Sequence, residues 1–64
     1  MNPFIVRAKC NRNELYSKGD KFIVLDQDEQ DNILMARLKD KIMLWLKNTD
    51  LKKDFKFFRE YSDK

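Results

Sequence analysis

The side chains that could carry out catalysis are few in this sequence and lie far apart. The 64-residue chain contains no His and a single Cys, Cys10, so no imidazole is present to activate that thiol as a nucleophile. No two carboxylates are paired in a plausible cleft, and a chain of this length has little room to build a catalytic pocket. The sequence therefore predicts a protein that is not an enzyme, with no catalytic residues and no cofactor.

A cluster of acidic residues lies in one polar segment that has the composition of a loop: Asp26, Asp28, Glu29 and Asp31. Asp26 and Asp28 match the first and third positions of a calcium-binding loop. The sixth position is Asp31 rather than Gly, and the twelfth is Arg37 rather than a bidentate Glu. We therefore predict no metal site here, and we interpret the charge run as a solvated loop.

The last third of the chain interleaves aromatic and basic side chains, a pattern that favours stacking on bases and pairing with phosphates. The candidate nucleic-acid-binding residues are Lys52, Lys53, Lys56, Phe57 and Arg59. The acidic residues Asp50, Asp54 and Glu60 interrupt this pattern, and the net charge of the chain is only +3. A small core also needs some of the nearby apolar residues, Leu51 and Phe55 first among them. Nucleic-acid binding is therefore the second of two functional interpretations.

Strand-forming patterns lie on both sides of the only glycine, Gly19. Its position directly before Lys21–Asp26 predicts a turn followed by a strand, with Phe22 and Val24 pointing inward. The earlier segment Phe4–Cys10 alternates apolar and polar residues, which predicts a half-buried strand. Its residues Phe4–Lys9 are a candidate for an open sheet edge.

The segment from Ile33 to Leu46 fits two different structures. As one helix, it places an apolar stripe on one side: Leu34, Leu38, Ile42, Trp45 and Leu46. As two strands, Ile33–Leu38 and Ile42–Leu46 are joined by a polar turn at Lys39–Lys41. The tail has the same ambiguity, because Phe55–Phe57 alternates as a strand does while Leu51, Phe55, Phe58 and Tyr61 follow helical spacing. The local pattern leaves both alternatives open.

A resemblance to a known family favours the strands. The order of features is Tyr16, Lys18-Gly19-Asp20, Phe22-Ile23-Val24, a charged loop through Asn32, two strands around Lys39–Lys41, a short helical turn at Asn48–Lys52 and an aromatic strand at Phe55–Phe58. This order resembles small SH3-like β-barrel proteins over residues 14–58. The resemblance implies one all-β domain over residues 1–64, with a five-stranded barrel and a frayed tail at 59–64. The chain departs from the family at Lys39–Lys41, where such barrels often carry Gly, so an α+β fold with an N-terminal hairpin and two helices stays the alternative.

A strand at Ile42–Leu46 would place Met43 and Trp45 on the face opposite Ile42, Leu44 and Leu46. A Trp beside a Met on an exposed strand is typical of a protein interface. We therefore predict protein–protein binding, as a first interpretation, through Trp45, Met43 and Tyr16, with Arg37 and Lys47 at the rim. The resemblance extends to accessory or inhibitor proteins of bacteria and phages that act by gripping another protein, and a homodimer is possible.

Cysteine content and hydropathy indicate where the protein acts. A single Cys forms no internal disulfide, which is typical of a reducing, intracellular compartment. No apolar run is long enough to cross a bilayer, and the N-terminal residues have none of the features of a secretion signal. We expect a cytoplasmic protein that does not bind membranes.

Overall fold

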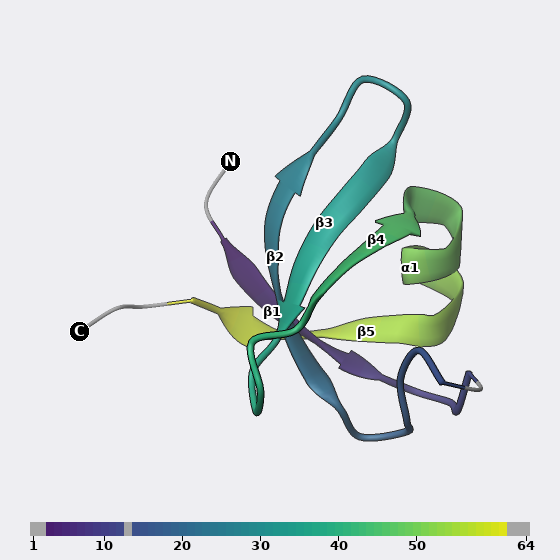
Figure 1. Cartoon of the computed structure of the whole chain (residues 1–64), viewed down its shortest axis with the longest axis vertical. Helices are drawn as coiled ribbons and strands as arrows, with labels where there is room; N and C mark the ends of the chain where they lie inside the picture. The colour runs from purple at the N-terminus through teal and green to yellow at the C-terminus, as the bar shows by residue number, and fades with distance from the viewer. Residues whose placement is uncertain (1–2, 13, 62–64) are drawn as a thin grey trace.

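The structure, a computed structural model, describes residues 3–12 and 14–61. It is an all-β fold with one short helix before the last strand (Figure 1). The elements are β1 (Phe4–Ala8), β2 (Lys21–Gln27), β3 (Asn32–Arg37), β4 (Met43–Lys47), α1 (Asn48–Asp54) and β5 (Phe55–Glu60). The predicted all-β fold is confirmed, and the alternative with two helices is wrong.

All five strands form one antiparallel sheet in the order β4-β3-β2-β1-β5. The first strand lies inside the sheet because the last strand pairs with its free side. The prediction that Phe4–Lys9 forms an open edge is therefore wrong, and the edges are β4 and β5. Extra residues at Leu25 in β2 and Phe58 in β5 shift the pairing register, and such bulges bend a sheet. The bent sheet brings α1 between β4 and β5 (Figure 1).

The turn at Lys39–Lys41 separates β3 from β4, as the two-strand interpretation requires. The Arg37 N–H donates to the Ile42 carbonyl (2.9 Å), and the Lys41 N–H donates back to the Arg37 carbonyl (2.8 Å). Lys41 has a φ of 63°, in the left-handed region that favours Gly. The Asp40 carboxylate accepts from the Ile42 N–H (3.2 Å) and holds the turn from inside. Ile42 itself precedes β4 and is exposed, so it does not join Leu44 and Leu46 at the core.

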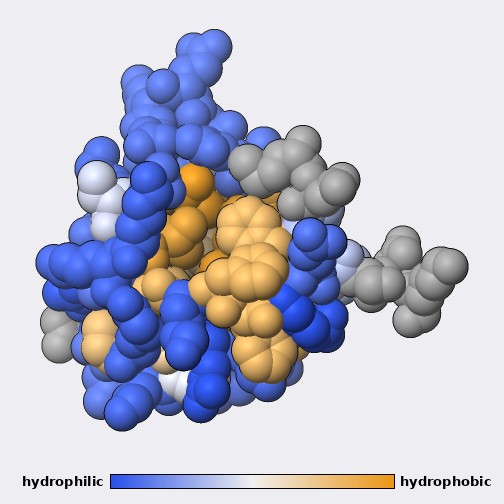
Figure 2. Space-filling model, turned by 180° about the vertical axis from the view of Figure 1, so that it is seen from behind, coloured by the Kyte–Doolittle hydropathy of each residue, from blue (hydrophilic) through white to orange (hydrophobic). Residues whose placement is uncertain are grey.

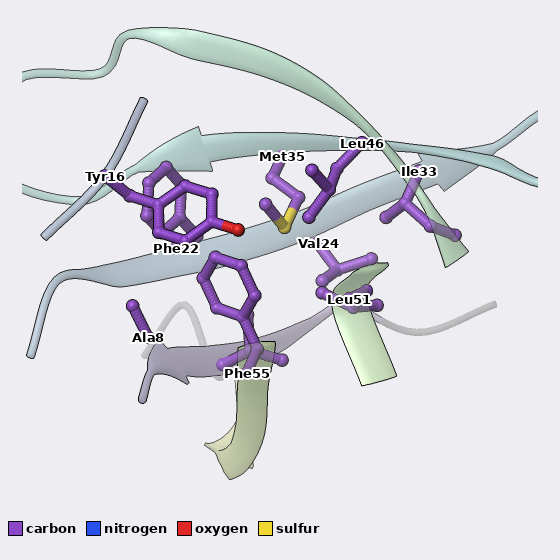
Figure 3. Packing of buried hydrophobic residues seen from close by; sticks show 10 residues of the cluster. Ala8, Tyr16, Phe22, Val24, Ile33, Met35, Leu46, Leu51 and Phe55 are labelled. Carbon is purple, nitrogen blue, oxygen red and sulfur yellow. The ribbon is translucent and has the colours of Figure 1, made fainter. Parts of the chain in front are cut away.

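The core lies between the inner face of the sheet and α1 (Figure 3). Its buried members are Val6, Ala8, Tyr16, Phe22, Val24, Ile33, Met35, Leu46, Leu51 and Phe55. The rings of Tyr16, Phe22 and Phe55 pack at tilted or edge-to-face angles, with centroids 4.7 to 6.3 Å apart. The predicted inward positions of Phe22 and Val24 are confirmed.

The helix α1 closes the core through residues three apart. Leu51 and Asp54 are its buried residues, because side chains at this spacing share one helix face. Asp50 in the first turn and Lys52 and Lys53 in the last turn have the signs that complement the helix dipole. A polar outer side and a narrow buried stripe are therefore sufficient to place this short helix.

The turn at Gly19 leads the chain into β2, and β5 ends the described part of the sheet. Gly19 has a φ of 94°, and its N–H donates to the Ala8 carbonyl (2.9 Å), which confirms the predicted turn before β2. Arg59 and Glu60 continue β5 and pair with β1, so the expected fraying is wrong at these two residues. Of the remainder of the expected frayed tail, Tyr61 donates its N–H to the Pro3 carbonyl (3.2 Å), and 62–64 lie outside the described residues.

Candidate interaction surface

The outward side of the sheet carries a continuous row of apolar side chains. Strand pairing places Met43, Ala36, Ile23 and Ile5 directly beside one another on four adjacent strands. Ile5 is only 1% exposed and Ala36 is 9% exposed, yet neither belongs to the core cluster. Their burial on this side shows that the surface packs its own apolar layer. We call it the outer face and define it by Ile5, Ile23, Leu34, Ala36, Met43, Trp45 and Phe58.

Two large side chains stand out from the outer face at its β4 end. Met43 and Trp45 are each 55% exposed, and Trp45 pairs with Leu34 on β3. Lys47 follows on the same side of β4 and is also exposed. The structure therefore brings together three of the five residues predicted for partner binding, with Met43 and Trp45 opposite the inward Leu46 as the alternation indicates.

Tyr16 and Arg37 lie elsewhere. Tyr16 is 2% exposed and forms part of the core, so it is not available to a partner. Arg37 pairs with the inward Phe22, with its guanidinium carbon 5.8 Å from that ring. It binds the Asp40 carboxylate (3.1 Å) and the Asp20 carboxylate (3.3 Å), and the bond to Asp40 raises the pKa of Arg37. Both predicted contact residues therefore have structural roles and leave the proposed patch.

Asp54 is the one buried carboxylate among the described residues, and Tyr16 is its partner in the core. The Tyr16 hydroxyl donates to Asp54 Oδ2 (2.6 Å), and Arg12 donates to the same oxygen from Nη2 (2.6 Å) and Nε (3.2 Å). These hydrogen bonds lower the pKa of Asp54 to about 2. Burial raises the pKa of Tyr16. At neutral pH Asp54 is therefore charged and Tyr16 is neutral. The pair joins the loop after β1 to α1 and is not suited to act as a general acid or base.

The predicted nucleic-acid-binding residues are all exposed but point to different sides. Phe57 pairs with Val6 and packs on Phe4 at 6.0 Å, so it faces the open end of the core. Lys56 and Arg59 point outward from β5, with partners Arg7 and Ile5. Lys52 and Lys53 lie on α1. Three of the five, Lys52, Lys56 and Phe57, line one hollow, but Lys53 and Arg59 do not, so the structure does not gather the whole set into one surface.

A shallow hollow of about 350 Å³ lies at the open end of the core, between β1, β5 and α1. Its lining combines the apolar residues Phe4, Val6, Leu51, Phe55 and Phe57 with Lys52 and Lys56. Figure 2 shows apolar side chains gathered around a hollow at the centre of one face, within a hydrophilic surround. Among the described residues, the first and the last lie close together, because the Tyr61 N–H donates to the Pro3 carbonyl (3.2 Å).

A row of cations borders the outer face and was not predicted from the sequence. Arg7 on β1 lies directly between Lys21 on β2 and Lys56 on β5. The Lys21 ammonium sits 4.4 Å from the centre of the Phe58 ring. The two neighbours of Arg7 are set by the pairing of strands that are distant in the sequence, which local alternation does not show.

Hydrogen bonds within the acidic loop pair the carboxylate of Asp28 with neighbouring donors. The Asp28 carboxylate accepts from the backbone N–H groups of Gln30 and Asn32, both at 2.9 Å. The bond from Asn32 is the largest of the effects that lower the pKa of Asp28. Within residues 3–12 and 14–61, no three His, Cys, Asp or Glu residues are grouped in a way that could hold a metal ion. No helix in the same ranges is long and apolar enough to cross a membrane.

Comparisons with protein-family models, with curated proteins and with solved structures found no match to this chain.

Proposed function

We propose that this protein is a non-catalytic binding module that holds another protein against the β4 end of its outer face. The observation that carries the proposal is the pair Met43 and Trp45, each more than half exposed on an edge strand. Large apolar side chains exposed together are typical of interaction sites, and Trp is among the residues that most often dominate binding energy.

The apolar surface continues inward from this pair. Leu34 is half-buried beside Trp45, and Ala36 and Ile23 extend the row from Met43 toward the middle of the sheet. A partner that covers Met43 and Trp45 would therefore rest on packed neighbours rather than on mobile polar side chains. Rigid support of this kind lowers the entropy lost on binding.

The charges around the face favour a different protein over a second copy of this chain. Lys47 lies at one end of the face, and Arg59 lies at the other end of the apolar row. A twofold pairing of two outer faces would bring these cations toward the cations of the other copy, whether the ends of the row coincide or exchange, which costs binding energy. A partner with acidic side chains around an apolar centre is the better fit, and a homodimer is the less favoured occupant.

The resemblance to small SH3-like barrels agrees with this role. The strand order and the short helix before β5 support that resemblance, which the proposal extends to accessory or inhibitor proteins of the bacterial and phage type. We place the site of action in the cytoplasm, because Cys10 is a free thiol among the described residues.

The test compares Trp45→Ser with a matched control, Leu15→Ser. Leu15 is also a large exposed apolar residue, but it lies in the loop after β1 and away from the outer face. Each tagged variant is used to capture partners from the native host, and the captured protein is then purified and titrated by calorimetry. We expect Trp45→Ser to weaken binding by about 2 kcal/mol, roughly 30-fold, with no loss of folded circular dichroism signal.

The control sets the interpretation. Leu15→Ser should leave the affinity for the purified partner within about threefold of the wild-type value. Equal losses in the two variants would show that capture depends on general stickiness, and unchanged affinity in Trp45→Ser would remove the outer face from the proposal. If Trp45→Ser unfolds, Trp45 is required for the stability of the fold. The affinity of Met43→Ser for the purified partner would then decide whether the outer face is the binding site.

A further inference from the structure

Three cations meet side by side across the outward surface of β2, β1 and β5. Arg7 pairs with Lys21 on one side and with Lys56 on the other, and all three side chains are exposed. Like charges directly opposite one another destabilise a sheet. Among the residues that the structure describes, none of the three forms an ion pair that would offset this repulsion. The arrangement is thus unfavourable for the sheet, and an anion bound from outside would relieve the repulsion.

Two further cations extend the row around a second hollow. Lys9 and Lys18 join Arg7 and Lys56 in lining a hollow of about 290 Å³, and its lining includes no carboxylate. We call Arg7, Lys9, Lys18, Lys21 and Lys56 the basic strip. The strip begins at the Gly19 turn and crosses to β5, so it draws on three separate segments of the chain.

The backbone beneath the basic strip is fixed by hydrogen bonds. The N–H of Gly19 donates to the Ala8 carbonyl (2.9 Å), and the N–H of Lys18 donates to the Asn11 side chain (2.8 Å), so the turn is held against β1. The N–H of Lys9 donates to the Asp54 carbonyl (2.7 Å) at the other border. The backbone that carries these cations is therefore ordered before any ligand arrives, which reduces the entropy lost on binding one.

An aromatic ring lies beside the basic strip. Phe58 is the extra residue of the β5 bulge and is 42% exposed, with the Lys21 ammonium 4.4 Å from its ring centre. A solvent-facing ring next to a row of cations is the combination used to stack a base while its phosphates are neutralised. A base in a duplex is already stacked and paired, so this combination selects single strands.

We propose that the basic strip and Phe58 form a binding site for single-stranded nucleic acid, with the phosphates along the strip and a base on the ring. This site is separate from the Met43 and Trp45 patch and does not depend on the proposed protein partner. It also differs from the cations of α1, since Lys52 and Lys53 lie outside the strip.

The test measures fluorescence anisotropy of a labelled single-stranded oligothymidylate titrated with the full chain at about 50 and 200 mM salt. Neutralising about three phosphates predicts that the logarithm of the affinity falls with the logarithm of salt with a slope near −2. The double variant Arg7→Gln/Lys56→Gln should lower the affinity about tenfold or more at the lower salt and reduce the slope by about 1.4.

The matched control is Lys52→Gln/Lys53→Gln, which removes the same charge from α1 and should change the affinity by less than about threefold. Phe58→Ala should weaken binding while leaving the salt slope unchanged, because a ring carries no charge. Removing the opposed charges at Arg7 and Lys56 should leave the variant at least as stable as the wild type in urea.

Four results would overturn the site. They are no binding at the lower salt, equal losses in the strip and control variants, equal affinity for a duplex of the same sequence, and displacement by polyglutamate as effective as by unlabelled oligothymidylate. The last result would reassign the strip to an acidic protein surface. Trp45→Ser should bind the oligonucleotide normally, so failure of this inference and failure of the proposed function are told apart.

Discussion

Replacing Tyr16 with Phe tests the buried hydrogen bond that joins the loop after β1 to α1. The substitution keeps the ring, which packs on Phe55 at 4.7 Å and on Phe22 at 6.3 Å. It removes only the hydroxyl that donates to the Asp54 carboxylate at 2.6 Å. Since the change opens little space, any loss of stability comes from the carboxylate left with fewer donors.

The magnitude follows from the surroundings of Asp54. A hydrogen bond to a charged group contributes about 1.5–3 kcal/mol to the free energy of unfolding. The carboxylate is 4% exposed, so water does not readily replace the hydroxyl, but both bonds from Arg12 remain. We therefore expect a loss of about 2 kcal/mol. In a domain of this size, that loss lowers Tm by roughly 8–16 °C.

The assay is urea unfolding followed by circular dichroism, with the dependence on urea compared as well as the midpoint. A double-mutant cycle with Asp54→Asn isolates the pair, because the Tyr16→Phe loss should shrink once the carboxylate is gone. Tyr61→Phe is the control, since Tyr61 is exposed and its hydroxyl should contribute little. A Tyr16→Phe variant within about 0.5 kcal/mol of the wild type would refute the reasoning. Weakened partner binding with unchanged stability would return Tyr16 to the contact patch.

Three further changes test the charges and the turns. The pKa of Asp54 is about 2 in the fold against an ordinary 3.8, so its stabilisation is complete above pH 3.8 and is lost as the pH falls toward 2. Guanidinium titrations across this pH range should show a steep fall in the free energy of unfolding of the wild type and a flatter fall for Asp54→Asn. Parallel curves for the two proteins would contradict this role of Asp54. Gly19→Ala should destabilise the fold by about 1 kcal/mol in the same measurement, because φ is 94° there although no atom lies within 4 Å of the added carbon. Lys41→Gly should raise Tm by a few degrees, since Gly adopts the φ of 63° without strain. A lower Tm would mean that the greater entropy of the unfolded chain outweighs this relief of strain.

Local pattern was sufficient for the parts of the fold that depend on neighbours in sequence. Alternation placed Phe22 and Val24 inward and separated Met43 and Trp45 from Leu46, and the lone glycine marked the turn before β2. The choice between one helix and two strands in the middle of the chain depended on the resemblance instead. No local pattern in the sequence predicts the left-handed backbone conformation of Lys41.

The errors concern contacts between distant residues. Tyr16 is buried because Asp54, 38 residues further along, accepts its hydroxyl hydrogen. Arg37 turns inward because the β2–β3 register sets it opposite Phe22. The row through Arg7 exists only because β1 lies between two other strands. Alternation gives the side of a strand that a residue occupies, but pairing decides which residues become its neighbours.

The position of β1 inside the sheet has a consequence for how the chain acquires its structure. Val6 pairs with Phe57, so the first strand receives its last partner from a segment about 50 residues away, and closing such a loop costs about 3.5 kcal/mol of chain entropy. When only the first four strands have left the ribosome, the nascent chain therefore lacks α1 and β5, and the apolar side of its strands is uncovered. We expect folding to wait for synthesis of the final segment and then to proceed more slowly than in helical proteins of equal length.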